Sequence, residues 1–198
     1  MQINDVLDVT LIVAAALDKL GISYLVGGSL ASSLHGIPRS THDADIVVDL
    51  KIEQVDALVS ELEGAFHIDG DSARDAIRRR RMFNILHLET LFKVDLFIPD
   101  EGEYSAQQMA RRQTLTVKRE PTRELSLASA EDVVLHKLHW FKLGGGASDR
   151  QWQDALAVIR VQSEKLDRSY LDQWASDLGV ADLLARALEE ADASGRDR

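Results

Sequence analysis

Cysteine is absent from this 198-residue sequence, and proline occurs only three times. Without cysteine the chain cannot form disulfide bonds, thiolate nucleophiles, iron–sulfur clusters or cysteine-based zinc sites. Long hydrophobic runs are absent too. The longest uncharged, mainly apolar run free of Gly and Ser covers residues 9–17, which is nine residues, whereas a membrane-spanning helix needs roughly 20. Because Asp5 and Asp8 stand where a signal peptide would carry basic residues, we expect a cytoplasmic protein without a membrane partner.

Positive charge is also scarce, since 23 Lys and Arg residues face 33 Asp and Glu residues, a net charge of −10. Such a chain has no long-range attraction for nucleic acid or anionic lipid, so any polyanion must meet a local basic patch or a bound metal ion. One basic run exists, and it is a candidate docking surface for an acidic acceptor, although such a run is most often a solvated helix face. Its arginines are Arg74, Arg78, Arg79, Arg80 and Arg81.

Hydrophobic spacing predicts two parts, an α/β portion of about 125 residues and an all-helical portion of about 65. In the first part we expect helices over 4–20, 29–35, 51–64 and 105–112, strands over 23–26, 43–50, 65–69, 82–88, 91–99 and 115–118, and a basic helix or loop over 71–81. In the second part we expect helices over 130–143, 149–163, 168–178 and 180–192. The predicted domains are residues 1–126 and 127–192, followed by a disordered tail over 193–198.

The turn Gly27-Gly28-Ser29 lies between a predicted strand and a predicted helix. A glycine turn that opens a helix gathers free backbone N–H groups at the positive end of the helix dipole, with no Cβ to obstruct a phosphate. By itself such a sequence is more often only a tight turn. Next to a metal site it is a candidate triphosphate cradle.

Asp43 and Asp45 lie two residues apart in a predicted strand, so they share a face and can hold a hard cation such as Mg²⁺. Asp95 interrupts another apolar strand. If the two strands are neighbours, three carboxylates converge, as two-metal phosphoryl transfer requires. The alternatives are that Asp43 caps the strand entry after Thr41, that Asp45 is an edge-strand charge, and that Asp95 pairs with Lys93 or an arginine.

Lys137 and Asp154 both fall on inward faces of predicted C-terminal helices. Lys137 is four residues from both Val133 and Phe141, and Asp154 is four residues from Val158. A contact between Lys137 and Asp154 across the two helices is therefore a natural hypothesis. The alternative for Lys137 is a buried stem with its amine at the surface.

The order of these motifs resembles the nucleotidyltransferase superfamily related to DNA polymerase β. The stretches Ala130–Leu138 and Asp149–Leu156 look like the lysine and aspartate motifs of AbiEii-type toxin nucleotidyltransferases. The resemblance implies an α+β fold, with a mixed β-sheet nucleotidyltransferase core flanked by helices and a C-terminal helical bundle. It also implies Mg²⁺-dependent transfer of a nucleoside monophosphate from an NTP to a hydroxyl of RNA or protein, with two Mg²⁺ ions or Mn²⁺ in their place, and a cognate antitoxin as a further partner.

On this resemblance the candidate site residues take distinct roles. Asp43, Asp45 and Asp95 would be catalytic metal ligands, and Asp95 would also accept the proton. The nucleotide would be bound by Gly27, Gly28, Ser29 and Lys137. Asp154 would be catalytic together with Lys137. Arg74, Arg78, Arg79 and Arg81 would dock the acceptor. The alternatives are a same-fold enzyme that modifies an antibiotic or other small molecule, and a non-catalytic nucleotide-binding or interaction protein.

Overall fold

The computed structural model describes residues 5–119 and 122–195, and these fall into two compact units. The first unit comprises the described residues up to Leu30 together with Thr41–Leu127, and the second comprises Ala31–Ser40 and the described residues from Ala128 onward. The domain boundary expected from the sequence, at 126/127, stays a prediction.

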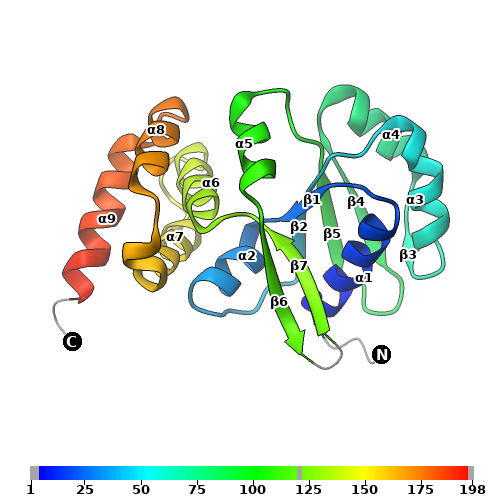
Figure 1. Ribbon diagram of the computed structural model, residues 1–198, viewed down its shortest axis with the longest axis horizontal. Helices are drawn as coiled ribbons and strands as arrows, with labels where there is room; N and C mark the ends of the chain where they lie inside the picture. The colour runs from blue at the N-terminus through cyan, green and yellow to red at the C-terminus, as the bar shows by residue number, and fades with distance from the viewer. Residues whose placement is uncertain (1–4, 120–121, 196–198) are drawn as a thin grey trace. The chain divides into compact units, whose positions relative to one another are not determined.

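The first unit is built on a sheet whose strands are β1 (Tyr24–Val26), β2 (Asp43–Val48), β3 (Phe66–His67), β4 (Met82–His87), β5 (Lys93–Phe97), β6 (Gln113–Arg119) and β7 (Thr122–Leu127). These strands form one seven-stranded sheet in the order β3-β4-β5-β2-β1-β7-β6 (Figure 1). The pairs β2/β5 and β1/β7 are parallel, and the other neighbouring pairs are antiparallel. The mixed sheet with its flanking helices confirms the predicted fold class.

Strand β2 shows why the sequence forms this sheet. Ala44, Ile46 and Val48 are fully buried and alternate with the less buried Asp43 and Asp45. Because successive side chains point to opposite faces of a strand, the apolar residues anchor β2 in the core while both carboxylates share the other face.

Strand β7 was not predicted from the sequence. Arg123 and Glu124 obscure its apolar alternation, yet Leu125 and Leu127 are completely buried. Thr122 is the single β-branched residue of the segment, so its strand conformation depends on pairing with β1 and β6 rather than on local propensity.

The helices of the first unit are α1 (Val6–Lys19), α3 (Val55–Leu62), α4 (Gly70–Arg79) and α5 (Glu103–Arg111), with a 3₁₀ turn η1 (Ile52–Gln54) before α3. Helix α1 contacts β2 and β7, α3 contacts α1 and α4, and α4 contacts β4 (Figure 1). The Asp5 carboxylate begins α1 by accepting a 2.9 Å hydrogen bond from the Asp8 backbone N–H. Together α1, α3 and α4 form a layer against the sheet.

The second unit contains α6 (Ala130–Leu143), α7 (Asp149–Gln162), α8 (Arg168–Asp177) and α9 (Ala181–Gly195), with a 3₁₀ turn η2 (Ser163–Lys165). Helix α2 (Gly28–His35) begins in the first unit and ends in the second. Gln162 holds its end there by donating a 2.6 Å hydrogen bond to the His35 carbonyl.

Helix α9 continues through Gly195, so the tail expected from residue 193 does not begin there, and residues 196–198 lie outside the described residues. Within the described ranges, no helix combines the length and apolar character needed to cross a membrane.

Candidate functional site

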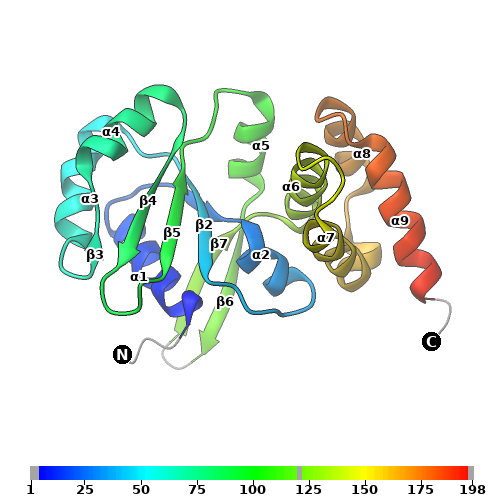
Figure 2. The same cartoon turned by 180° about the vertical axis from the view of Figure 1, so that it is seen from behind.

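Strands β2 and β5 lie side by side and parallel, which brings the three predicted acids onto neighbouring strands (Figure 2). Asp45 is directly opposite Asp95, and Asp43 is directly opposite Lys93. Paired residues in a sheet project from the same face, and like charges directly opposite one another are destabilising. The predicted adjacency of the two strands is confirmed, and it places two carboxylates where they need a cation.

Asp95 is the most buried of the three acids, with 6% of its surface exposed. Its Oδ2 forms an ion pair with the Lys93 ammonium at 2.8 Å, so the alternative pairing considered from the sequence does occur. Among the described residues, however, no donor reaches the buried Oδ1. A buried carboxylate oxygen without a donor costs free energy and marks a place where a cation or a donor from outside the chain would bind favourably.

Lys93 supplies positive charge next to these acids. A hydrogen bond to Asp95 raises the pKa of Lys93 above its ordinary value, burial opposes this, and the charges of Asp95, Asp43 and Asp45 add to the rise. The Lys93 ammonium therefore lies in the field of all three carboxylates.

The glycine turn lies directly against Asp45. The Gly27 backbone N–H donates a 2.8 Å hydrogen bond to the Asp45 carbonyl. Gly28 has a φ of 56°, and a Cβ at this position would lie 2.6 Å from the Asp45 Cγ. Only glycine satisfies both the left-handed backbone and this close approach. The turn that opens α2, with Ser29 as its next residue, thus lies beside the carboxylates as the sequence predicts.

Asp43 is oriented at the start of β2 by Thr41, whose hydroxyl donates a 2.8 Å hydrogen bond to the Asp43 Oδ1. This matches the capping alternative considered from the sequence. One such hydrogen bond leaves further oxygen lone pairs for a cation.

The residues present fit a divalent cation in their chemistry. Carboxylate oxygens are the ligands that Mg²⁺ prefers, and the unpartnered Asp95 Oδ1 is one such oxygen. In the part of the chain that the structure describes, no three His, Asp or Glu side chains are arranged to hold a metal ion as they stand. The strand register brings the backbones together, so sharing an ion would require the Asp43, Asp45 and Asp95 side chains to turn toward one another.

A second charged cluster lies within the second unit. Lys137 is 4% exposed, and its ammonium is 2.8 Å from the Asp154 Oδ2, so the hypothesised contact between α6 and α7 is present. Arg39 binds the same carboxylate with two hydrogen bonds of 2.7 Å, from Nε to Oδ1 and from Nη2 to Oδ2. Burial, the largest single influence on Asp154, opposes its ionisation. The hydrogen bonds from Arg39 and Lys137 outweigh it and hold the pKa of Asp154 below the ordinary value.

Sequence reasoning missed Arg39, which lies 115 residues from Asp154 in the chain. It follows Gly36-Ile37-Pro38 in a loop without periodicity, so no local pattern connects it to α7. The one signal in the sequence was Asp154 itself, because a carboxylate on the inward face of a helix requires partners for its charge.

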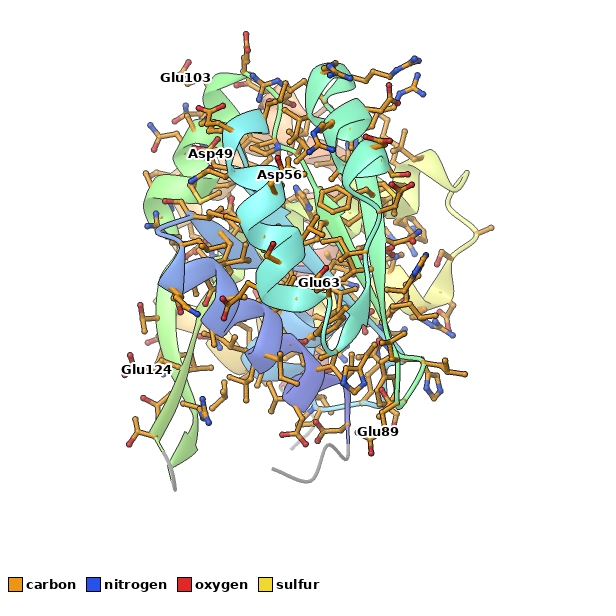
Figure 3. All side chains as sticks on the ribbon, turned by 90° about the vertical axis from the view of Figure 1, so that its right-hand side faces the viewer. Asp49, Asp56, Glu63, Glu89, Glu103 and Glu124 are labelled. Atoms are coloured by element: carbon orange, nitrogen blue, oxygen red, sulfur yellow. The ribbon has the colours of Figure 1, made fainter. Side chains whose placement is uncertain are left out.

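The arginine run occupies α4 and the residues after it, and acidic neighbours neutralise much of it. Arg74 pairs with Asp56 and Asp71, Arg79 with Asp75, and Arg80 with Glu101. Arg78 and Arg81 are exposed. Figure 3 labels Asp56 among the acidic residues of this unit, and its side chain is 86% exposed. The run is therefore a mixed-charge surface, which weakens its case as a docking site for a polyanion.

No protein-family model and no curated protein matches the sequence. Among solved structures, an antigenic nucleotidyltransferase-like protein from Paracoccidioides brasiliensis matches with a TM-score of 0.55 and 18% identity, over 91% of this chain and 90% of that chain.

Two further structures match at TM-scores from which we draw no conclusion. The antibiotic-resistance factor ANT(2'')-Ia has a TM-score of 0.46 at 17% identity, over 98% of this chain and 94% of that chain. The lincosamide antibiotic adenylyltransferase LnuA, in its lincomycin-bound form, has a TM-score of 0.49 at 13% identity, over 79% of this chain and 98% of that chain. The likeness to the Paracoccidioides protein shows that this chain has a nucleotidyltransferase-like fold.

Proposed function

We propose that the chain is a metal-dependent nucleotidyltransferase that moves a nucleoside monophosphate from an NTP to a hydroxyl acceptor. The observation that carries the proposal is the unpartnered, buried Asp95 Oδ1 on the strand directly opposite Asp45, with the Gly28 turn packed against Asp45. A buried carboxylate oxygen without a donor, close to a glycine turn that opens a helix, is typical of a site that binds a cation and a phosphate together.

In this proposal Asp43, Asp45 and Asp95 hold two Mg²⁺ ions, or Mn²⁺ in their place. When bound, such ions polarise the α-phosphate and neutralise charge on the departing pyrophosphate. The turn at Gly28 and Ser29 binds the triphosphate, because the N-terminal end of a helix carries partial positive charge and favours anions.

The transfer step forms one bond and breaks one. The acceptor oxygen attacks the α-phosphorus in line, the bond from that phosphorus to the bridging oxygen of the β-phosphate breaks, and pyrophosphate leaves. The proton of the acceptor hydroxyl passes to a carboxylate oxygen of Asp95. The chain contributes chiefly position and charge, as in other phosphoryl transfers.

For the acceptor we propose a hydroxyl of RNA or protein, as in AbiEii-type toxins, with a cognate antitoxin as a partner. The paired Lys137 and Asp154 support this version, since these residues carry the AbiEii-like motifs. Lys137 as a nucleotide contact stays a prediction. Full transfer activity in Lys137→Ala would remove Lys137 from the nucleotide site.

The test is to incubate the protein with each α-labelled NTP and Mg²⁺ or Mn²⁺, in the presence of total RNA, purified protein or small hydroxylated compounds. We expect label on RNA or protein, and no label with Asp45→Asn. Label on a small compound alone would instead assign the small-molecule alternative. Binding of NTP without label on any acceptor would contradict the transferase and support the non-catalytic alternative.

A further inference from the structure

Among the described residues, the Lys93 ammonium contacts one of the two carboxylate oxygens of Asp95. It is bound to Oδ2 while Oδ1 stays without a donor. The Lys93 side chain is 44% exposed, so its ammonium can leave for solvent without crossing the core. An ion pair with a partly exposed cation contributes little net stability, because solvent screening and lost side-chain entropy offset most of the attraction. The contact is therefore one that a divalent ion can displace.

The position of Lys93 in the sheet is not incidental. The register places it opposite Asp43, two residues before Asp95, so it shares the sheet face of all three acids. A positive charge at this position repels a divalent ion that enters the same cluster, because like charges a few ångströms apart repel one another. Lys93 therefore both neutralises the empty cluster and competes with a metal for it.

We propose that Lys93 is a built-in counter-cation that keeps the acidic cluster from binding free divalent ions until a triphosphate arrives with its metal. The inference rests on the proposed function of Asp43, Asp45 and Asp95 as metal ligands. The triphosphate supplies the negative charge that offsets the added metal charge and draws the ammonium away from Asp95. Metal binding is thereby coupled to nucleotide binding, and Lys93 acts as a positioning residue rather than a catalytic one.

The test is Mn²⁺ binding, measured by the electron paramagnetic resonance signal of free Mn²⁺, with and without a nonhydrolysable NTP. Lys93→Met should bind Mn²⁺ about tenfold more tightly than the wild type when no nucleotide is present. The gain in affinity that the NTP analogue gives should shrink correspondingly. Lys93→Arg, which keeps the charge, should behave like the wild type.

The matched control is Lys51→Met. Lys51 is 54% exposed in its side chain and pairs with Asp49, which Figure 3 labels on the same unit. The control removes the same charge from a lysine that pairs with a carboxylate outside the cluster, so its Mn²⁺ affinity should not change. Equal Mn²⁺ affinities in Lys93→Met and Lys51→Met would overturn the inference.

Thermal unfolding gives a second readout, in which the recovery on adding Mn²⁺ is the part that a purely structural role of Lys93 would not produce. In EDTA, Lys93→Met should melt below the wild type because the acids lose their counter-cation, and Mn²⁺ should restore it by more than it stabilises the wild type. If Lys93→Met does not fold, Lys93→Gln serves in the same two measurements. A melting loss that Mn²⁺ does not recover would contradict the inference.

The outcomes separate this inference from the proposed function. If the wild type binds Mn²⁺ with the NTP analogue and Asp45→Asn does not, the metal site stands and only the Lys93 comparison decides the inference. If the wild type shows no Mn²⁺ binding that depends on Asp45, with or without nucleotide, both the metal site and the inference fail.

Discussion

The two charged clusters of this protein use similar residues in opposite ways. In the first unit, three carboxylates face one half-exposed lysine, and one buried oxygen of Asp95 has no donor among the described residues. In the second unit, the Asp154 carboxylate receives donors on both oxygens from two cations. A carboxylate whose two oxygens both have donors stabilises the fold, whereas a buried oxygen without a donor favours an outside ligand. We therefore infer that the ion pairs of Asp154 stabilise the second unit and that the first cluster binds a ligand, while the contact of Lys137 with a nucleotide stays a separate prediction.

The largest expected effect is on transfer activity in the first cluster. Asp95→Asn should lower the rate of nucleoside monophosphate transfer at least about 1,000-fold, because it removes a metal ligand and the proposed proton acceptor. The free energy of unfolding should change by no more than about 1 kcal/mol, since the substitution also relieves repulsion from Asp45. Rates of label transfer and urea unfolding measure the two quantities.

Glu63→Gln is the control for this prediction. Glu63 is an exposed acidic residue labelled in Figure 3, so its loss changes the net charge equally but should leave transfer unchanged. An Asp95→Asn protein with normal transfer would remove Asp95 from the site.

The second cluster should respond in stability. Asp154→Asn keeps the shape but leaves the buried Lys137 and the Arg39 guanidinium without a counter-charge, so the free energy of unfolding should fall by about 3 kcal/mol. Urea unfolding measures it. The double variant Lys137→Met/Asp154→Leu should lose less, because it leaves no buried lysine unpaired. An unchanged Asp154→Asn protein would contradict the structural assignment.

Acidification should weaken the second unit. Burial, with the charges of His139 and Lys137, lowers the pKa of His136 to about 4. The unfolded chain, with a His pKa near 6.5, therefore binds a proton that the folded chain does not bind. Stability should fall as the pH drops from about 6.5 to about 4, by about 3 kcal/mol at most.

The ion-paired Asp154 has a lowered pKa, so its contribution to stability is present above about pH 4 and is lost on further acidification.

Urea unfolding at pH 7 and pH 4.5, in the wild type and His136→Gln, tests the His136 prediction. The variant should lose less stability than the wild type between the two pH values. Equal losses would contradict a His136 that stays neutral in the folded chain at pH 4.5.

The smallest expected effect separates geometry from charge at Asp154. Arg39→Lys keeps the positive charge but loses the two-pronged hydrogen bond, so it should cost about 1 kcal/mol of unfolding free energy. Urea unfolding beside Arg39→Met measures it. A loss as large as that of Arg39→Met would show that the retained charge contributes nothing, and no loss in Arg39→Lys would contradict the contribution of the two-pronged geometry.

Much of the first cluster can be predicted from the sequence, because the positions of its acids follow from residue spacing within single strands. The two-residue spacing of Asp43 and Asp45 fixes their common face, and the apolar flanks of Asp95 predict its buried strand. Likewise, helical spacing predicts the Lys137 to Asp154 contact. What the sequence does not reveal depends on distant pairing. Arg39 reaches Asp154 from a loop without periodicity, and β7 is a strand because β1 and β6 flank it. The seventh strand and the second cation at Asp154 therefore depend on tertiary contacts, which local sequence patterns do not reveal.

The central claim is that the acids on β2 and β5 bind a metal–nucleotide complex. Isothermal titration calorimetry with Mg²⁺ and a nonhydrolysable NTP tests it most directly, in the wild type, Asp43→Ala and Asp45→Ala. We predict saturable binding to the wild type and its loss in both variants, with folding retained in both. Unchanged affinity for the Mg²⁺–NTP complex in both variants would contradict the claim.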